Sequence, residues 1–160
     1  MRSKSEHFRD FVLDNLYLKS GTSQAPKRRQ LSGLVHNEGD TIFMGGDFNF
    51  TESPEDGGSL LTGPTAAFWH NLCSSLGLRE VYQGGHTFSR GDSSSRLDRF
   101  YCNLDEADRL LYTPMAYLKA SGAADIGKSG AMAGNALFTD HHPVSMRLFT
   151  TERSKDRDFN

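Results

Sequence analysis

Asp47 and Asn49 are the first residues in this chain whose types and spacing suggest chemistry. They follow a short apolar segment, residues 41–44, and two glycines. If the backbone is still extended at that point, both side chains leave the same face of the strand. A carboxylate and a carboxamide at the end of a buried strand are suited to binding a metal, a water molecule or a phosphate. The same pair could instead cap a turn, as Asx residues often do after glycine.

A second acidic residue, Asp98, lies in a segment of alternating character, residues 96–103. Alternation in a strand places Asp98 on the same face as Phe100 and Cys102. Burying a carboxylate on an apolar face is costly unless the charge is paired. The pattern therefore predicts a partner for Asp98, and a histidine would serve.

Near the end of the chain, Asp140 is followed by two adjacent histidines, His141 and His142. Neighbouring residues of an extended chain point in opposite directions, so both imidazoles are not expected to bind one ion. The two cysteines, Cys73 and Cys102, do not have the spacing of a zinc site. Isolated cysteines favour reduced thiols in an intracellular protein, either nuclear or cytoplasmic.

Three helices are predicted to pack around these residues. Apolar residues of the segment 5–18 recur near every 3.6 positions, which indicates an amphipathic helix. A second short helix is predicted over 27–36, with its three basic residues on a solvated face. The third is predicted over 64–76, between a proline that starts it and a glycine that ends it. Its Trp69 is expected in the core and its His70 in solvent.

The remaining pattern is mostly strand and loop. Residues 41–44 are expected to form a buried strand that the two following glycines break, and these glycines allow a ligand to approach closely. A loop over 51–63 would directly follow the site, residues 121–135 would be a long loop near the site or poorly ordered, and a charged tail is expected over 151–160. Further strands are predicted over 78–82, 86–89, 96–103, 114–118 and 144–150, a hairpin-like loop over 90–95 and a short helix over 104–112.

Composition narrows the class of protein. The chain has 160 residues, of which 36% are hydrophobic and 24% charged, and this is typical of one globular domain rather than a disordered chain. The net charge is −2, so any contact with nucleic acid must come from a local patch. The sequence has no apolar run of about 18 residues that would predict a membrane-spanning helix.

Three stretches occur in an order that resembles a known family. The stretches are Gly46-Asp47-Phe48-Asn49, Ser95-Arg96-Leu97-Asp98-Arg99-Phe100-Tyr101 and Thr139-Asp140-His141-His142-Pro143, with His86-Thr87-Phe88 before the second. Through them the chain resembles the C-terminal part of the endonuclease/exonuclease/phosphatase superfamily, the DNase I-like phosphodiesterases. Within that superfamily the motifs are closest in style to the endonuclease domains of non-LTR retrotransposons and of apurinic-type enzymes.

The resemblance implies catalytic roles for four residues. Asp47 would orient or deprotonate the attacking water, and Asn49 would hold Asp47 and contact the scissile phosphate. Asp98 would pair with His141 and favour its imidazolium form, because a nearby carboxylate raises the pKa of an imidazole. A purely structural ion pair between Asp98 and His141 is the alternative.

The resemblance also implies a metal and a substrate. Asp140 would help to hold Mg²⁺, with Mn²⁺ as a substitute, because carboxylate and amide oxygens suit these hard ions. Thr87, Asn49 and His141 would contact the substrate. Nucleic acid is the expected partner, DNA more than RNA, and no membrane is expected.

The implied fold is α/β, a DNase I-like sandwich of two mixed or antiparallel sheets flanked by helices. Residues 1–150 would form only the C-terminal half of that domain. Strands that carry an Asn, the main metal-binding Glu, and a phosphate-contacting Tyr or His could not be placed in the chain. One sheet would then expose an apolar face. The sequence therefore leaves three functions open: a Mg²⁺-dependent endonuclease, a phosphatase or deadenylase of the same superfamily, and a non-catalytic remnant of a retroelement endonuclease.

Overall fold

The computed structural model describes residues 2–3, 11–21, 23–118 and 140–150, and it is a mixed α/β structure. Three helices, one short 3₁₀ helix and nine strands lie in this part of the chain. In chain order the elements are β1 (Arg2–Ser3), β2 (Phe11–Tyr17), α1 (Gln24–Leu31), β3 (Thr41–Asp47), η1 (Pro54–Asp56), α2 (Gly63–Leu76), β4 (Arg79–Glu80), β5 (Phe88–Arg90), β6 (Ser93–Ser95), β7 (Asp98–Cys102), α3 (Glu106–Leu111), β8 (Tyr112–Leu118) and β9 (Val144–Thr150).

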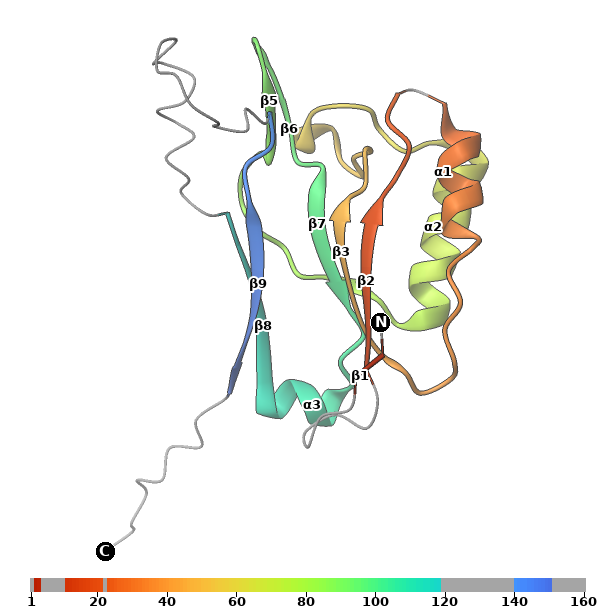
Figure 1. Cartoon of the computed structure of the whole chain (residues 1–160), viewed down its shortest axis with the longest axis vertical. Helices are drawn as coiled ribbons and strands as arrows, with labels where there is room; N and C mark the ends of the chain where they lie inside the picture. Colours follow the sequence, from red (N-terminus) through yellow and green to blue (C-terminus); the bar gives the residue numbers. More distant parts are fainter. Residues whose placement is uncertain (1, 4–10, 22, 119–139, 151–160) are drawn as a thin grey trace, which may run out of the picture.

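The elements form three layers (Figure 1). The middle layer is a five-stranded sheet in the order β1-β2-β3-β7-β4. Helices α1 and α2 cover one face of this sheet, and the two-stranded sheet β8-β9 lies on the other side. A separate hairpin, β5-β6, stands beside the end of β7. Within the described residues, the helices and the second sheet therefore face opposite sides of the central sheet.

The ends of three adjacent strands meet at one end of the central sheet. β2 runs parallel to β3, and the register sets Tyr17 opposite Asp47. β7 runs antiparallel to β3 on the other side, and the register sets Asp98 opposite Asp47. Asp47 thus ends the middle strand of the three, with a neighbour on each side.

Two apolar clusters hold the layers together. The larger one lies between the sheet and the helices and includes fully buried aromatic rings whose centroids are 5.1 to 5.8 Å apart: Phe48, Phe50, Trp69 and Tyr101. The smaller one joins the sheet to β8-β9 through Phe43, Cys102, Ala116 and Met146. Among the described strands of the central sheet, the predicted uncovered apolar face is seen at β2, where Leu13 is 44% exposed, whereas β8 and β9 cover Phe43 and Cys102.

The helix predicted over 5–18 is wrong from residue 11 onward, where the chain forms strand β2; residues 5–10 lie outside the described part. Val12, Asp14 and Leu16 are more buried than Leu13 and Asn15, which is the alternation of a strand. Seven backbone pairs with β3 override the apparent helical spacing of the apolar residues.

The second predicted helix exists, but its limits were wrong. α1 begins at Gln24 and ends at Leu31, so it neither starts at residue 27 nor reaches residue 36. Lys27 is fully buried, which contradicts a solvated face for all three basic residues. The polar segment before Lys27 is helical because Ser23 adopts the extended conformation of an N-cap and Pro26 stands in the first turn.

Most other predicted elements are confirmed, with bounds that differ by a few residues. α2 covers 63–76 and ends at Gly77 in the left-handed conformation, with Trp69 buried and His70 64% exposed at its side chain. The loop over 90–95 is the β5-β6 hairpin, and the final strand is β9. The predicted strand over 78–82 shrinks to two residues in β4. The predicted loop over 121–135 and the tail over 151–160 lie outside the described residues.

None of the helices in the described part of the chain has the length and apolar character needed to cross a bilayer. Both cysteines, Cys73 and Cys102, are free thiols. Burial raises the pKa of the Cys73 thiol to about 12 and also raises that of Cys102.

Candidate active site

The glycines before Asp47 do not break the strand as predicted. β3 continues through Gly45 and Gly46 to Asp47. Gly46 has a φ of 142°, and a Cβ there would overlap the carbonyl oxygen of Leu16 on β2. A Cβ on Gly45 would overlap the ring of Phe100 on β7. The two glycines therefore allow β2 and β7 to approach β3 closely on either side, and this approach sets the position of Asp47.

Asp47 and Asn49 form a closed hydrogen-bonded pair. The Asn49 backbone N–H donates to Asp47 Oδ1 at 2.9 Å, and Asn49 Nδ2 donates to Asp47 Oδ2 at 2.7 Å. Asn49 has a φ of 48°, a left-handed conformation that asparagine tolerates better than most residues. The turn formed by Asn49 is therefore also part of the candidate site, because Asn49 holds both carboxylate oxygens of Asp47.

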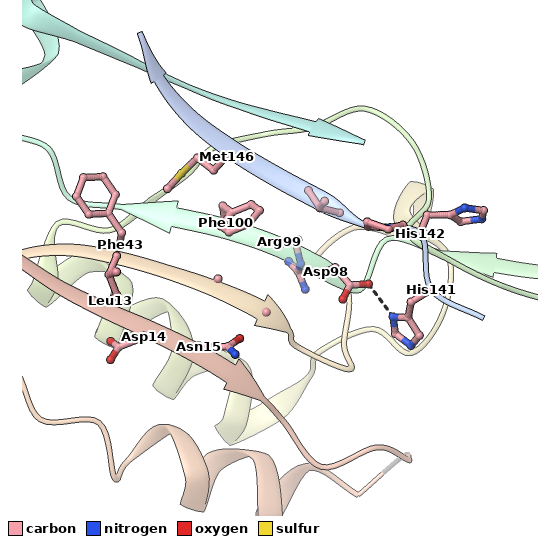
Figure 2. Close-up of a pocket in the computed structure, with 14 residues that line it drawn as sticks. Leu13, Asp14, Asn15, Phe43, Asp98, Arg99, Phe100, His141, His142 and Met146 are labelled. Carbon is pink, nitrogen blue, oxygen red and sulfur yellow. Dashed lines mark hydrogen bonds and ion pairs between the residues drawn. The ribbon is translucent and has the colours of Figure 1, made fainter. Parts of the chain in front are cut away.

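The histidine partner expected for Asp98 is His141. His141 Nδ1 lies 2.8 Å from Asp98 Oδ2, the contact drawn as a dashed line in Figure 2. An ionised carboxylate can only accept, so this contact places a proton on Nδ1. The other ring nitrogen, Nε2, is 3.9 Å from Asp47 Oδ2. The ring of Phe88 packs against the imidazole with centroids 5.1 Å apart. His141 is therefore oriented between two carboxylates.

Asp47 has the chemistry of a base. Burial is the main cause that raises the pKa of its carboxyl, and the charge of Asp98 raises it further. The hydrogen bonds from Asn49 and the charge of His141 lower the pKa and offset part of that effect. A carboxylate with a raised pKa accepts a proton more readily near neutral pH than an ordinary one does.

The Thr87 hydroxyl oxygen accepts two backbone hydrogen bonds in the interior of the protein. The Thr87 side chain is fully buried, and Oγ1 accepts from the backbone N–H groups of Leu97 at 3.0 Å and Asp98 at 2.9 Å. Its carbonyl accepts from the His142 N–H at 2.6 Å. This burial disagrees with the predicted contact between Thr87 and the substrate. Thr87 instead joins the strand that carries Asp98 to the segment that carries His141.

Asp140 is set apart from the other acidic residues. Its side chain is 51% exposed, and Oδ2 lies 3.7 Å from Arg90 Nε. Within the described ranges, no three His, Cys, Asp or Glu side chains gather as they would around a metal ion. The donor chemistry still fits Mg²⁺, since Asp47, Asn49 and Asp140 offer oxygens and Asp47 is a nearly buried anion that a cation would stabilise.

A cavity of about 650 Å³ opens beside the Asp98–His141 pair (Figure 2). It lies between β2, β3 and β7 on one side and the start of β9 on the other. Leu13 and Asn15 of β2 line it together with Phe100 and Met146. An apolar floor with charged groups at one end is a common form of ligand site.

Sequence analysis missed two residues of β2, Asn15 and Tyr17. Asn15 lines the cavity, and Tyr17 lies opposite Asp47 in the register and is 69% exposed. Neither residue was assigned to the site, because the segment was predicted to be a helix. Leu13, Asn15 and Tyr17 alternate with more buried neighbours in the structure, but the residue types of the segment do not alternate, so the sequence held no local signal for them.

Buried arginines fix the loop that follows Asn49, which was predicted only as a polar loop. Arg99 is fully buried and donates to Glu52 Oε1 at 2.9 Å, and the same oxygen accepts from Tyr101 Oη at 2.6 Å and Trp69 Nε1 at 3.0 Å. Arg96 Nε donates to Asp56 Oδ1 at 2.7 Å. These contacts hold the loop against β7 and α2, and they fix the position of the chain that follows Asn49.

In comparisons with protein-family models, curated proteins and solved structures, nothing matches this chain.

Proposed function

We propose that this protein is a Mg²⁺-dependent phosphodiesterase of the DNase I-like type that cuts DNA as an endonuclease. The arrangement of His141 carries the proposal: one ring nitrogen bonds Asp98, and the other faces Asp47. The α/β layers and the three sequence motifs support a DNase I-like sandwich as the fold. The resemblance to the endonuclease domains of retrotransposons and apurinic-type enzymes supports nucleic acid as the substrate.

The residues at this end of the central sheet suit hydrolysis of a phosphodiester. Asp47, with its raised pKa, would accept a proton from the attacking water. Asn49 would keep the Asp47 carboxylate in place through its two hydrogen bonds. His141, held by Asp98, would donate from Nε2 to a phosphate oxygen and stabilise the charge that develops there.

Tyr17 is a candidate for contact with the phosphate, the role that no residue could be assigned from the sequence. It is exposed and lies beside Asp47 at the same edge of the sheet. A phenolic hydroxyl can donate to a phosphate oxygen.

Asp140 would help to hold the Mg²⁺ ion, with the Asn49 amide oxygen as a further donor; Mn²⁺ would substitute. When bound, the ion supplies positive charge to the phosphate and the developing oxyanion. Asp140 would have to leave Arg90 to take part, and the 3.7 Å spacing of that exposed pair makes the exchange inexpensive.

Nicking of supercoiled plasmid by the purified chain tests the proposal. We expect nicking in Mg²⁺ or Mn²⁺, none with a chelator, and losses of at least about a hundredfold in His141→Ala and Asp47→Ala. His70→Ala is the matched control, since this histidine is exposed on α2. Absence of nicking in a folded sample, or nicking that survives in His141→Ala, would refute the proposal.

A non-catalytic binding protein is the second candidate. The observation that favours it is the lack of a three-residue metal cluster among the described residues. It predicts binding of a DNA oligonucleotide or another partner with no metal-dependent cleavage. Cleavage of phosphate monoesters or polyadenylate, but not plasmid, would instead indicate a phosphatase or deadenylase.

A further inference from the structure

The segment between β2 and α1 passes directly beside the candidate site. The backbone N–H of Leu18 donates to the Asp47 carbonyl at 2.9 Å. The Leu18 carbonyl accepts from Asn49 Nδ2, also at 2.9 Å. Because the same Nδ2 donates to the Asp47 carboxylate, the direction of the Leu18 carbonyl decides how Asn49 holds Asp47.

Gln30 of α1 holds the backbone on both sides of Leu18. Its Oε1 accepts from the Lys19 N–H at 2.7 Å, and its Nε2 donates to the Tyr17 carbonyl at 3.1 Å. One side-chain amide thus bonds the two residues that flank Leu18. These bonds are exposed, so they add little to the free energy of unfolding, but they fix the direction of the backbone between them.

Lys27, one turn earlier in α1, holds the far end of the same segment. Its side chain is fully buried, and Nζ donates to the Gly21 carbonyl at 2.6 Å. Among the described residues, no carboxylate forms an ion pair with it. Burial lowers the pKa of the ammonium group, and the charge of Asp47 opposes that effect. A buried charge without an ion-pair partner is a poor source of stability, which argues that Lys27 has another role.

We propose that Lys27 and Gln30 are positioning residues of the active site. They hold segment 17–21 so that the Leu18 carbonyl orients Asn49 and, through Asn49, the Asp47 carboxylate. The proposal deepens the phosphodiesterase function proposed above and rests on it for its kinetic consequences. The contacts themselves do not depend on that function, so they can be tested without it.

Lys27→Met and Gln30→Met test the proposal, because methionine keeps the length of each side chain and removes its polar atoms. Lys27→Met should unfold at the same urea concentration as wild type or a higher one, since an apolar side chain replaces a buried unpaired charge. The Asn49 side-chain NH₂ signals in a ¹⁵N–¹H spectrum should move toward those of an unstructured amide. We expect kcat to fall about 10- to 100-fold with little change in KM.

Conservative variants separate positioning from general damage. Lys27→Arg keeps the charge and the donors and should restore most of kcat. Gln30→Glu keeps the acceptor for Lys19 but loses the donor to Tyr17, so it should restore kcat only in part. Arg29→Met, on the same helix with an exposed side chain, is the matched control and should leave the Asn49 signals and kcat unchanged.

The outcomes are distinct. Asn49 signals that stay unchanged in both Met variants would overturn the positioning role, whatever the activity. A loss of stability in Lys27→Met that matches its loss of activity would also overturn it, because a merely structural lysine behaves in that way. Asn49 signals that shift in a protein whose wild type never nicks DNA would support positioning and refute the proposed phosphodiesterase function instead.

Discussion

His141 owes its orientation to residues from separate parts of the chain. Asp98 bonds Nδ1 from β7, Phe88 packs on the ring from β5, and Asp47 faces Nε2 from β3. A proton on Nδ1 leaves Nε2 facing the carboxylate of Asp47. The Asp98 carboxylate therefore selects both the tautomer of His141 and the direction in which the ring acts.

Replacing Asp98 by asparagine should remove its control over the tautomer of His141, with little change in the shape of the side chain. We expect Asp98→Asn to lower kcat by about 10²- to 10⁴-fold, because the imidazole loses its fixed tautomer and the charge that stabilises its protonated form. The measurement is the rate of plasmid nicking under saturating substrate. Asp92→Asn, in the exposed turn of the β5-β6 hairpin, is the control, and a variant at Asp98 that keeps a tenth of the activity would contradict the expectation.

The raised pKa of Asp47 has a consequence for the pH dependence of activity. A base works only when deprotonated, so activity should be lost as pH falls through the pKa of Asp47. Burial raises that pKa, and the acidic limb of kcat/KM should therefore lie above the ordinary carboxyl value of about 3.9. In Asp98→Asn the limb should move to lower pH, since the charge of Asp98 is one cause of the elevation. A limb at or below the ordinary value would exclude Asp47 as the base.

Residue types singled out Asp47 and Asn49 and predicted a histidine partner for Asp98, because few arrangements justify a carboxylate on an apolar strand face; the family resemblance named His141 as that partner. Their contacts agree with the expectation that Asp98 pairs with a histidine. Tyr17 could not be predicted, since its importance comes from the register of β2 against β3 rather than from its type. Thr87 was assigned to the substrate because a hydroxyl near a motif does not reveal that its oxygen already accepts two backbone bonds.

Strand β3 depends on its glycines, because a Cβ atom has no room where β2 and β7 approach the strand. Gly46→Ala should be strongly destabilising, because its Cβ would overlap the Leu16 carbonyl and its φ of 142° disfavours any side chain. We expect a loss of about 2–4 kcal/mol in the free energy of unfolding in urea. Gly84→Ala is the control, since a Cβ there meets nothing within 4 Å. Equal stability of the two variants would show that β2 can move away from β3.

Helices with strong end signals were the most predictable elements, and α2 is the example. Its proline near the start and glycine at the end fixed both limits. β2 was the least predictable, because Val12 and Leu16 satisfy a helical spacing as well as a strand alternation. Only pairing with β3 decides between the two, and pairing between distant segments leaves no local mark in a sequence.

The second sheet holds the histidine segment against the central sheet through a small apolar cluster. Met146 of β9 packs against the cluster that contains Cys102 of β7, a residue that is 1% exposed. Met146→Ala should weaken this contact by about 2–3 kcal/mol and raise the rate at which a thiol reagent labels Cys102 in the native protein. Met115→Ala is the matched control, because Met115 is on the partner strand and is 45% exposed.

Cys73 provides an internal reference for that measurement. It lies on α2, in the layer on the opposite side of the central sheet, and burial raises the pKa of its thiol to about 12. Cys73 should therefore stay unreactive near neutral pH in both variants. Equal acceleration at the two cysteines would mean that Met146→Ala destabilises the whole structure rather than the second sheet.

The pairing of Asp98 with His141 should also form at a particular stage of folding. The two residues are 43 positions apart, with Asp98 at the start of β7 and His141 just before β9, whereas Asp47 and Asn49 are joined by a local turn. Contacts between near neighbours close quickly during folding, and distant ones close late. A refolding chain should thus regain its circular dichroism before its histidine reaches Asp98, and catalytic competence would be the last property to return.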